Sequence, residues 1–132
     1  MYLANLSNEQ KELFLDLSMY SINSHGAVDE REKLLLRKYC EEMKIDYRED
    51  RKIQSIEEIL SGLKNISNET ELKKMTVELL AIMYADEELQ DEESELLSML
   101  QKTFGFDSNL MGGLTFVTRH LLLSYQLLQN II

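Results

Sequence analysis

Apolar residues recur along this chain at intervals of three and four, which is the spacing of an α-helix with one buried face. The segments with this pattern cover residues 7–24, 29–45, 55–64, 68–84, 90–105 and 114–130. Strand-like alternation is not sustained anywhere, and proline is absent from the sequence. The pattern therefore predicts an all-α fold, a compact bundle of about six to seven helices.

Polar residues that cap helices support the expected helix starts. Ser7 is followed three residues later by Gln10, and Asn68 is followed three residues later by Glu71. In this spacing each side chain accepts a hydrogen bond from a main-chain N–H that the first helical turn leaves free. The stretch 68–84 becomes apolar almost all round in its second half, which favours a central position in the bundle.

Glycines mark the end of the fifth predicted helix and the expected start of the last one. Gly105 is suited to the left-handed conformation that closes a helix. Gly112-Gly113 is expected to break or loosen the chain, so a closing helix is predicted over 114–130. That helix is more apolar than one buried face requires. It either packs into the core or offers a surface for self-association.

The chain aligns with itself at an offset of 61 residues, with matching apolar positions in the two halves. The alignment pairs Leu35 with Leu96, and Glu32 with Glu93. We therefore predict one domain over residues 1–132 that contains two helical hairpins, with pseudo-repeats over about 7–45 and 68–106.

The turn of each predicted hairpin is acidic. Residues 84–95 contain seven carboxylates and no base, and residues 23–32 form a weaker copy. The first copy reads Ser-His-Gly-Ala-Val-Asp-Glu-Arg-Glu over 24–32, and the second reads Ala-Asp-Glu-Glu-Leu-Gln-Asp-Glu-Glu over 85–93. These turns resemble the signature of the TerB-like domains of tellurite-resistance proteins, a module related to one in DjlA-type co-chaperones.

The resemblance implies an all-helical domain, an acidic cluster proposed to bind metal ions, and a role in stress or metal resistance. By position it carries over Asp29, Glu32, Asp86 and Glu93 as metal-binding residues. The chain departs from the family at His25, which stands where the family has an Asp. It also has Gln90 in the second copy where the first copy has Asp29.

Two interpretations of the acidic turns remain open. Carboxylates at a helix start accept main-chain hydrogen bonds and favour the positive helix end, so they can serve as caps and a solubilising surface. Residues 86–88, however, follow the end of a predicted helix, where the dipole disfavours negative charge. A divalent cation would relieve that crowding. The order of these acids does not fit an EF-hand loop, and no other cofactor is expected.

The acids are expected to be exposed, and the sequence contains no nucleophile elbow, phosphate loop or HExxH motif. We therefore do not expect an enzyme. The net charge of −10 excludes binding of nucleic acid through a basic face. The single cysteine, Cys40, is expected in the core, and no segment is long enough to span a membrane. These features predict a cytoplasmic protein.

The sequence thus predicts a non-catalytic, TerB-like acidic module that binds divalent cations or a protein partner. The alternative is a structural protein that forms homo-oligomers through its C-terminal helix and has no metal site.

Overall fold

The computed structural model describes residues 1–24, 30–48, 50–84 and 91–132. Over these ranges the chain forms α-helices and no strand, which confirms the predicted all-α class. The helices are α1 (Asn8–Asn23), α2 (Glu30–Met43), α3 (Ile56–Ile66), α4 (Glu69–Met83), α5 (Asp91–Phe104) and α6 (Ser108–Ile131).

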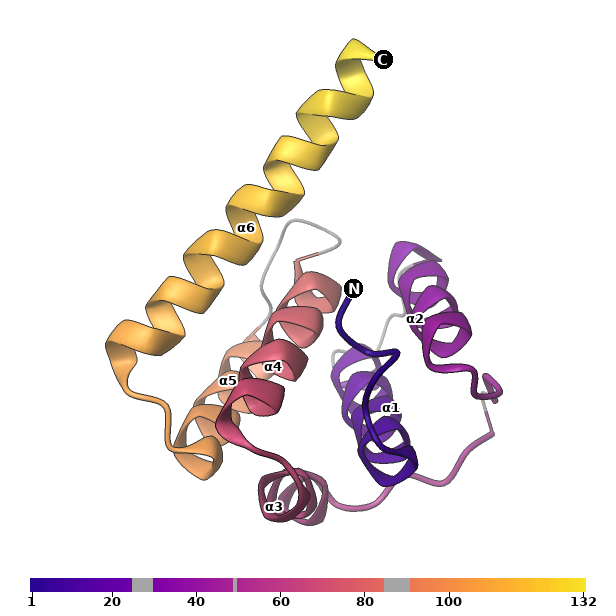
Figure 1. The fold of residues 1–132 in the computed structure, drawn as a ribbon, viewed down its shortest axis with the longest axis vertical. Helices are drawn as coiled ribbons and strands as arrows, with labels where there is room; N and C mark the ends of the chain where they lie inside the picture. The colour runs from indigo at the N-terminus through magenta and orange to yellow at the C-terminus, as the bar shows by residue number, and fades with distance from the viewer. Residues whose placement is uncertain (25–29, 49, 85–90) are drawn as a thin grey trace.

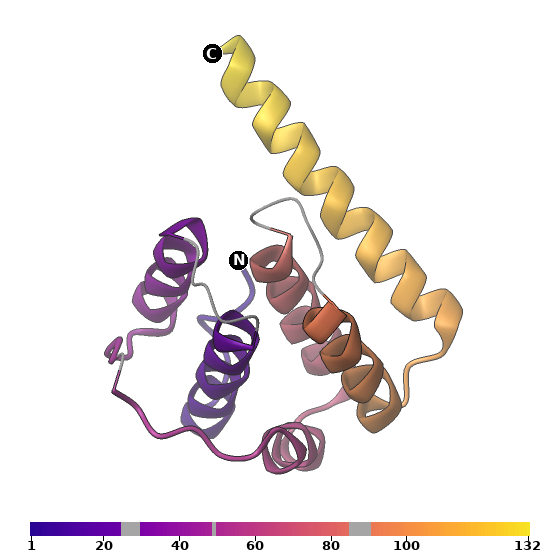
Figure 2. The same ribbon diagram turned by 180° about the vertical axis from the view of Figure 1, so that it is seen from behind.

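Helices α1 and α4 lie at the centre of the fold (Figure 1). Helix α2 packs against both of them, while α3 crosses one end of the molecule and contacts α1 and α5. Seen from behind, α2 and α5 lie on opposite sides of α1 (Figure 2). Helix α6 packs against α4.

The core fills the space between these helices with side chains that are almost fully shielded from water. Phe14 and Leu17 of α1, Leu63 of α3, and Met75 and Leu79 of α4 are all completely buried. Helix α4 buries residues on most of its circumference, including Leu80 and Ile82 on either side of its main stripe. The central position that its composition predicts is therefore confirmed.

The predicted caps are present. Ser7 and Gln10 form a capping box at the start of α1, and Asn68 and Glu71 form another at the start of α4. At the end of α5, Gly105 has a φ of 74°, the left-handed conformation expected of a closing glycine.

The expected break at Gly112-Gly113 is wrong. Helix α6 runs without interruption through both glycines, and Asp107 caps its start by accepting a hydrogen bond from the Leu110 N–H at 2.7 Å. Each glycine in a helix costs about 1 kcal/mol relative to alanine, so the pair costs about 2 kcal/mol, which is similar to what burying one large apolar side chain contributes. Met111, a buried residue of the core cluster, lies directly beside the pair.

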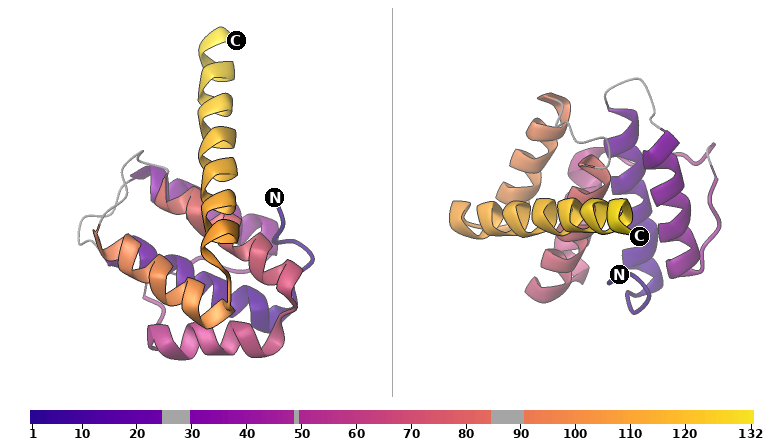
Figure 3. Two further views of the ribbon diagram at one scale, coloured as in Figure 1. Left: turned by 90° about the vertical axis from the view of Figure 1, so that its left-hand side faces the viewer. Right: turned by 90° about the horizontal axis from the view of Figure 1, so that it is seen from above.

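The second half of α6 does not enter the core. Met111 and Thr118 are the buried residues of this helix, and from Arg119 to Ile132 every residue except Leu122 is exposed. The helix projects well beyond the rest of the fold (Figure 3). Of the two interpretations of the closing helix, packing into the core is therefore wrong for the part after Thr118.

Candidate functional sites

Two of the four predicted metal-binding residues are described by the structure. Glu32 lies in the first turn of α2 with 1% of its surface exposed, and Glu93 lies in the first turn of α5 with 0% exposed. The expectation that the turn acids are exposed is wrong for these two. Asp29 and Asp86 lie outside the described residues.

Among the described residues, no three His, Cys, Asp or Glu side chains come close enough to hold a metal ion. The described side chains alone therefore do not make up the six or more oxygen ligands that Ca²⁺ or Mg²⁺ takes.

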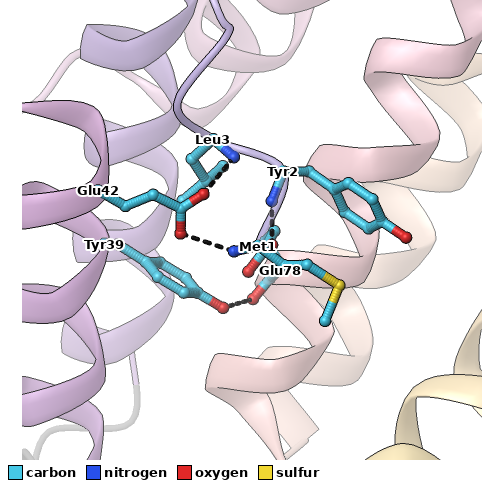
Figure 4. Close-up of polar contacts among 6 residues, drawn as sticks. All are labelled: Met1, Tyr2, Leu3, Tyr39, Glu42 and Glu78. Carbon is cyan, nitrogen blue, oxygen red and sulfur yellow. Dashed lines mark hydrogen bonds and ion pairs between the residues drawn. The ribbon is translucent and has the colours of Figure 1, made fainter.

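A different group of acids surrounds the N-terminal amine, and we call Met1, Glu42 and Glu78 the amino-terminal clamp (Figure 4). The amine lies 2.6 Å from Glu42 Oε1 and 2.9 Å from Glu78 Oε1. The Leu3 N–H donates to Glu42 Oε2 at 2.7 Å, and the Tyr2 N–H donates to Glu78 Oε1 at 2.9 Å. The clamp therefore joins the first residues of the chain to both α2 and α4.

The charges of the clamp stabilise one another. Burial lowers the pKa of the Met1 amine, but its hydrogen bonds with Glu42 and Glu78 outweigh burial and leave that pKa above its ordinary value of 8.0. Burial raises the pKa of Glu42, and the hydrogen bonds from the amine and the Leu3 N–H outweigh it, so this pKa lies below 4.5.

Tyr39 completes the surroundings of Glu78. Its hydroxyl donates to the main-chain oxygen of Glu78 at 2.7 Å, and burial next to the Glu78 charge raises the pKa of the hydroxyl. Sequence reasoning missed the clamp. The available signal was Glu78 itself, a charged residue on a helix that is apolar on nearly every side, because such a residue needs a partner when it is buried.

A second feature is a groove of about 880 Å³ along one side of α6, which we call the α6 groove. Gly112 and Thr115 lie in its wall, and Tyr84 borders it from the end of α4. The Arg119 guanidinium lies 5.1 Å from the centre of the Tyr84 ring, a cation–π contact. His120 is exposed and stacks on Phe116 with ring centres 4.0 Å apart.

Cys40 is buried, as predicted, and burial raises the pKa of its thiol to about 11. A thiol in this state is poorly nucleophilic near neutral pH, because the reactive species is the thiolate.

Within the described residues, no helix has the length and apolar character needed to cross a membrane. Comparisons with protein-family models, with curated proteins and with solved structures give no match to this chain.

Proposed function

We propose that this protein is a non-catalytic helical module that self-associates through the projecting half of α6. The observation that carries the proposal is the apolar surface of that segment. Nine large apolar side chains between residues 116 and 132 each expose at least half of their surface to solvent. These are Phe116, Val117, Leu121, Leu123, Tyr125, Leu127, Leu128, Ile131 and Ile132.

The size of this surface fits a protein interface. Nine half-exposed side chains of this size leave on the order of 800 Å² of apolar surface, taking about 150–250 Å² for a large one. This total is spread around the helix. It exceeds the largest contiguous apolar patch on an ordinary monomer, about 300–600 Å², and is similar to the roughly 800 Å² that each partner buries in a typical stable complex. A single helix without tertiary packing is also marginally stable in water, so covering this surface stabilises α6 itself.

The proposal is tested by analytical ultracentrifugation of the full chain at micromolar concentrations. We expect a dimer or larger assembly for the natural sequence and a monomer for Leu128→Asp. Asn130→Asp introduces the same charge two residues away without removing an apolar side chain, and we expect it to leave the assembly intact. Circular dichroism checks that each variant keeps its helices. A monomeric natural chain at every concentration would refute the proposal.

A second function, cation binding by a TerB-like acidic turn, is supported by a separate observation. The starts of α1 and α2 recur 61 residues later as the starts of α4 and α5. The end of α2 recurs at the same offset as the end of α5. Glu32 and Glu93 occupy the same place in this repeat, and both are buried. We propose that these glutamates, with Asp29 and Asp86, make the two turns equivalent sites for a divalent cation.

Calorimetric titration with Ca²⁺, Mg²⁺, Mn²⁺ and Zn²⁺ tests this second function. We expect binding heat and a raised melting temperature for the natural chain. The variant Asp86→Asn with Glu93→Gln changes only the second turn, so we expect it to bind about half as much metal per chain. Glu95→Gln is the matched control, because Glu95 is an exposed acid on the same helix. Absence of heat and of a melting shift at millimolar metal would rule out cation binding and leave the acids as caps and solubilising charge.

A further inference from the structure

The apolar residues of α6 follow a coiled-coil pattern. Starting at Leu110, the spacing alternates between four and three residues through the whole helix. The positions in this series are Leu110, Leu114, Val117, Leu121, Ser124, Leu128 and Ile131. An alternation of three and four is the heptad repeat, in which the first (a) and fourth (d) positions of every seven face a partner helix. We call this series the α6 seam.

The seam is exposed where α6 leaves the body of the molecule. Leu110 and Leu114 are partly buried against the core, whereas Val117, Leu128 and Ile131 expose 64%, 50% and 83% of their surface. Six of the nine exposed apolar residues between 116 and 132 are in the seam or directly beside it, within about 120° of the helix circumference. The α6 groove lies on the other side of the helix. A partner helix on the seam therefore leaves the groove open.

We infer that the seam binds the seam of a second copy of this chain as an antiparallel two-stranded coiled coil. This inference rests on the self-association proposed above and identifies the surface that carries it. A second copy of the chain fits because the seam contains both the a and the d positions that such a pair requires. In antiparallel pairs an a position of one helix meets a d position of the other. Leu114 then meets Ile131 of the second copy, and Val117 meets Leu128.

All residues that pair in this register lie within α6. The third layer places Leu121 against Ser124 of the second copy, and the two-fold symmetry repeats all three layers in reverse order. The overlap from Leu114 to Ile131 is about 26 Å long at about 1.5 Å per residue. Each layer except the one with Ser124 joins two apolar side chains. The C-terminal part of one seam, which is exposed, therefore covers the N-terminal part of the other seam, where Leu114 is only partly buried.

Charge favours the antiparallel orientation. Residues 1–107 contain 24 acids and 13 bases, a formal charge of −11, and the only charged residue after them is Arg119. A parallel pair would place both acidic bodies at the same end of the coiled coil, where they repel each other. An antiparallel pair places them at opposite ends, beyond the distance of about 8–10 Å over which salt screens exposed charges. The positions flanking the seam, which often fix orientation through salt bridges, carry no Asp, Glu, Lys or Arg.

A matched pair of variants tests the surface. Leu121 is in the seam and Leu123 is outside it, yet they expose 50% and 51% of their surface. We expect Leu121→Asp to abolish dimerisation in analytical ultracentrifugation and Leu123→Asp to retain it. Leu123 also lines the α6 groove, so loss of the dimer in Leu123→Asp alone would overturn the seam while preserving self-association. Equal losses in both variants would overturn it as well, because they indicate a general apolar surface.

Disulfide formation tests the orientation. We expect a mixture of the Val117→Cys and Leu128→Cys chains to crosslink under mild oxidation, because the antiparallel register sets these positions opposite each other. Leu128→Cys alone should not crosslink. Its two copies would lie about 16 Å apart along the axis, and a disulfide tolerates at most about 7 Å between Cα atoms. Crosslinking of Leu128→Cys with itself would overturn the antiparallel arrangement. The natural thiol, Cys40, is buried and does not compete.

If the natural chain is a monomer at every protein concentration, both the proposed self-association and the inferred coiled coil are refuted. If the natural chain is a dimer that Leu121→Asp does not disturb, only the seam is refuted. Because the dimer covers apolar helix surface, melting of α6 should also become concentration-dependent, with a higher melting temperature at higher protein concentration.

Discussion

The amino-terminal clamp makes a quantitative prediction about stability and pH. Replacing both acids, Glu42→Gln with Glu78→Gln, keeps an oxygen acceptor for the main-chain N–H groups of Tyr2 and Leu3 but removes both charges facing the Met1 amine. Hydrogen bonds to charged groups contribute about 1.5–3 kcal/mol each when they are shielded from water. The clamp is only partly shielded, since Glu78 exposes 6% of its side chain but Met1 exposes 58%.

Solvent screening therefore reduces the expected loss to about 1–2 kcal/mol for the pair. For a domain of this size that loss lowers the melting temperature by about 3–8 °C. Urea unfolding followed by circular dichroism measures the free energy of unfolding directly. Glu41→Gln is the control, because Glu41 is an exposed neighbour on α2 and its loss changes the net charge without touching the amine.

The pH dependence of the stability difference between the natural chain and the double variant distinguishes an effect of charge from an effect of packing. The amine has a folded-state pKa above 8.0, so its contribution is present below pH 8.0 and is lost as the pH rises through the folded-state pKa. Glu42 has a folded-state pKa below 4.5, so its contribution is present above pH 4.5 and is lost as the pH falls through that pKa. The gap between natural and variant chains should be widest between these limits and close on both sides. A gap that stays constant with pH would show that the substitutions act through packing.

Three further predictions concern single positions. Arg51 Nε lies 2.5 Å from Oδ1 of buried Asp16, so Arg51→Leu leaves a buried carboxylate without this partner and should lower the free energy of unfolding by about 3–5 kcal/mol in urea. Adding Asp16→Leu removes that carboxylate and should recover most of the loss. Gly112→Ala should stabilise α6 by up to about 1 kcal/mol, since an added Cβ meets no atom within 4 Å, whereas Gly105→Ala should cost about 1–2 kcal/mol at its positive φ. Thermal melting should show a raised melting temperature for Gly112→Ala and a lowered one for Gly105→Ala. Cys40 should resist thiol reagents in the folded protein and react in urea, because its pKa is about 11 and it is buried.

Local signals in the sequence predicted the helical part of this structure well. The capping boxes at Ser7 and Asn68 depend on side chains only three residues apart, so the sequence contains all the information needed. Closure of α5 at Gly105 is equally local. The class of fold and the central place of α4 follow from apolar spacing in the same way.

Long-range contacts were not predictable by the same means. In the amino-terminal clamp, Met1 contacts Glu42, 41 positions away, and Glu78, which is farther still. No local sequence pattern around Met1 predicts contact with these two acids. Helix α6 continues through Gly112 next to the buried Met111, and the packing of a side chain against a distant helix cannot be read from the local preference of two glycines. The exposure of the second half of α6 depends on where the helix leaves the body, which is a property of the whole fold (Figure 3).

Burial also divides the described acids of this chain into three groups with different physical roles. Asp16 and Glu78 are buried and ion-paired, so each is tied to the fold through a positive partner. Glu32 and Glu93 are buried at matching helix starts, where the positive end of the helix dipole lowers the cost of burying a carboxylate. Most of the other acids on the described helices are exposed and keep the body negative. Because α6 carries none of them, it is the element on which two such bodies can meet without bringing their charges together.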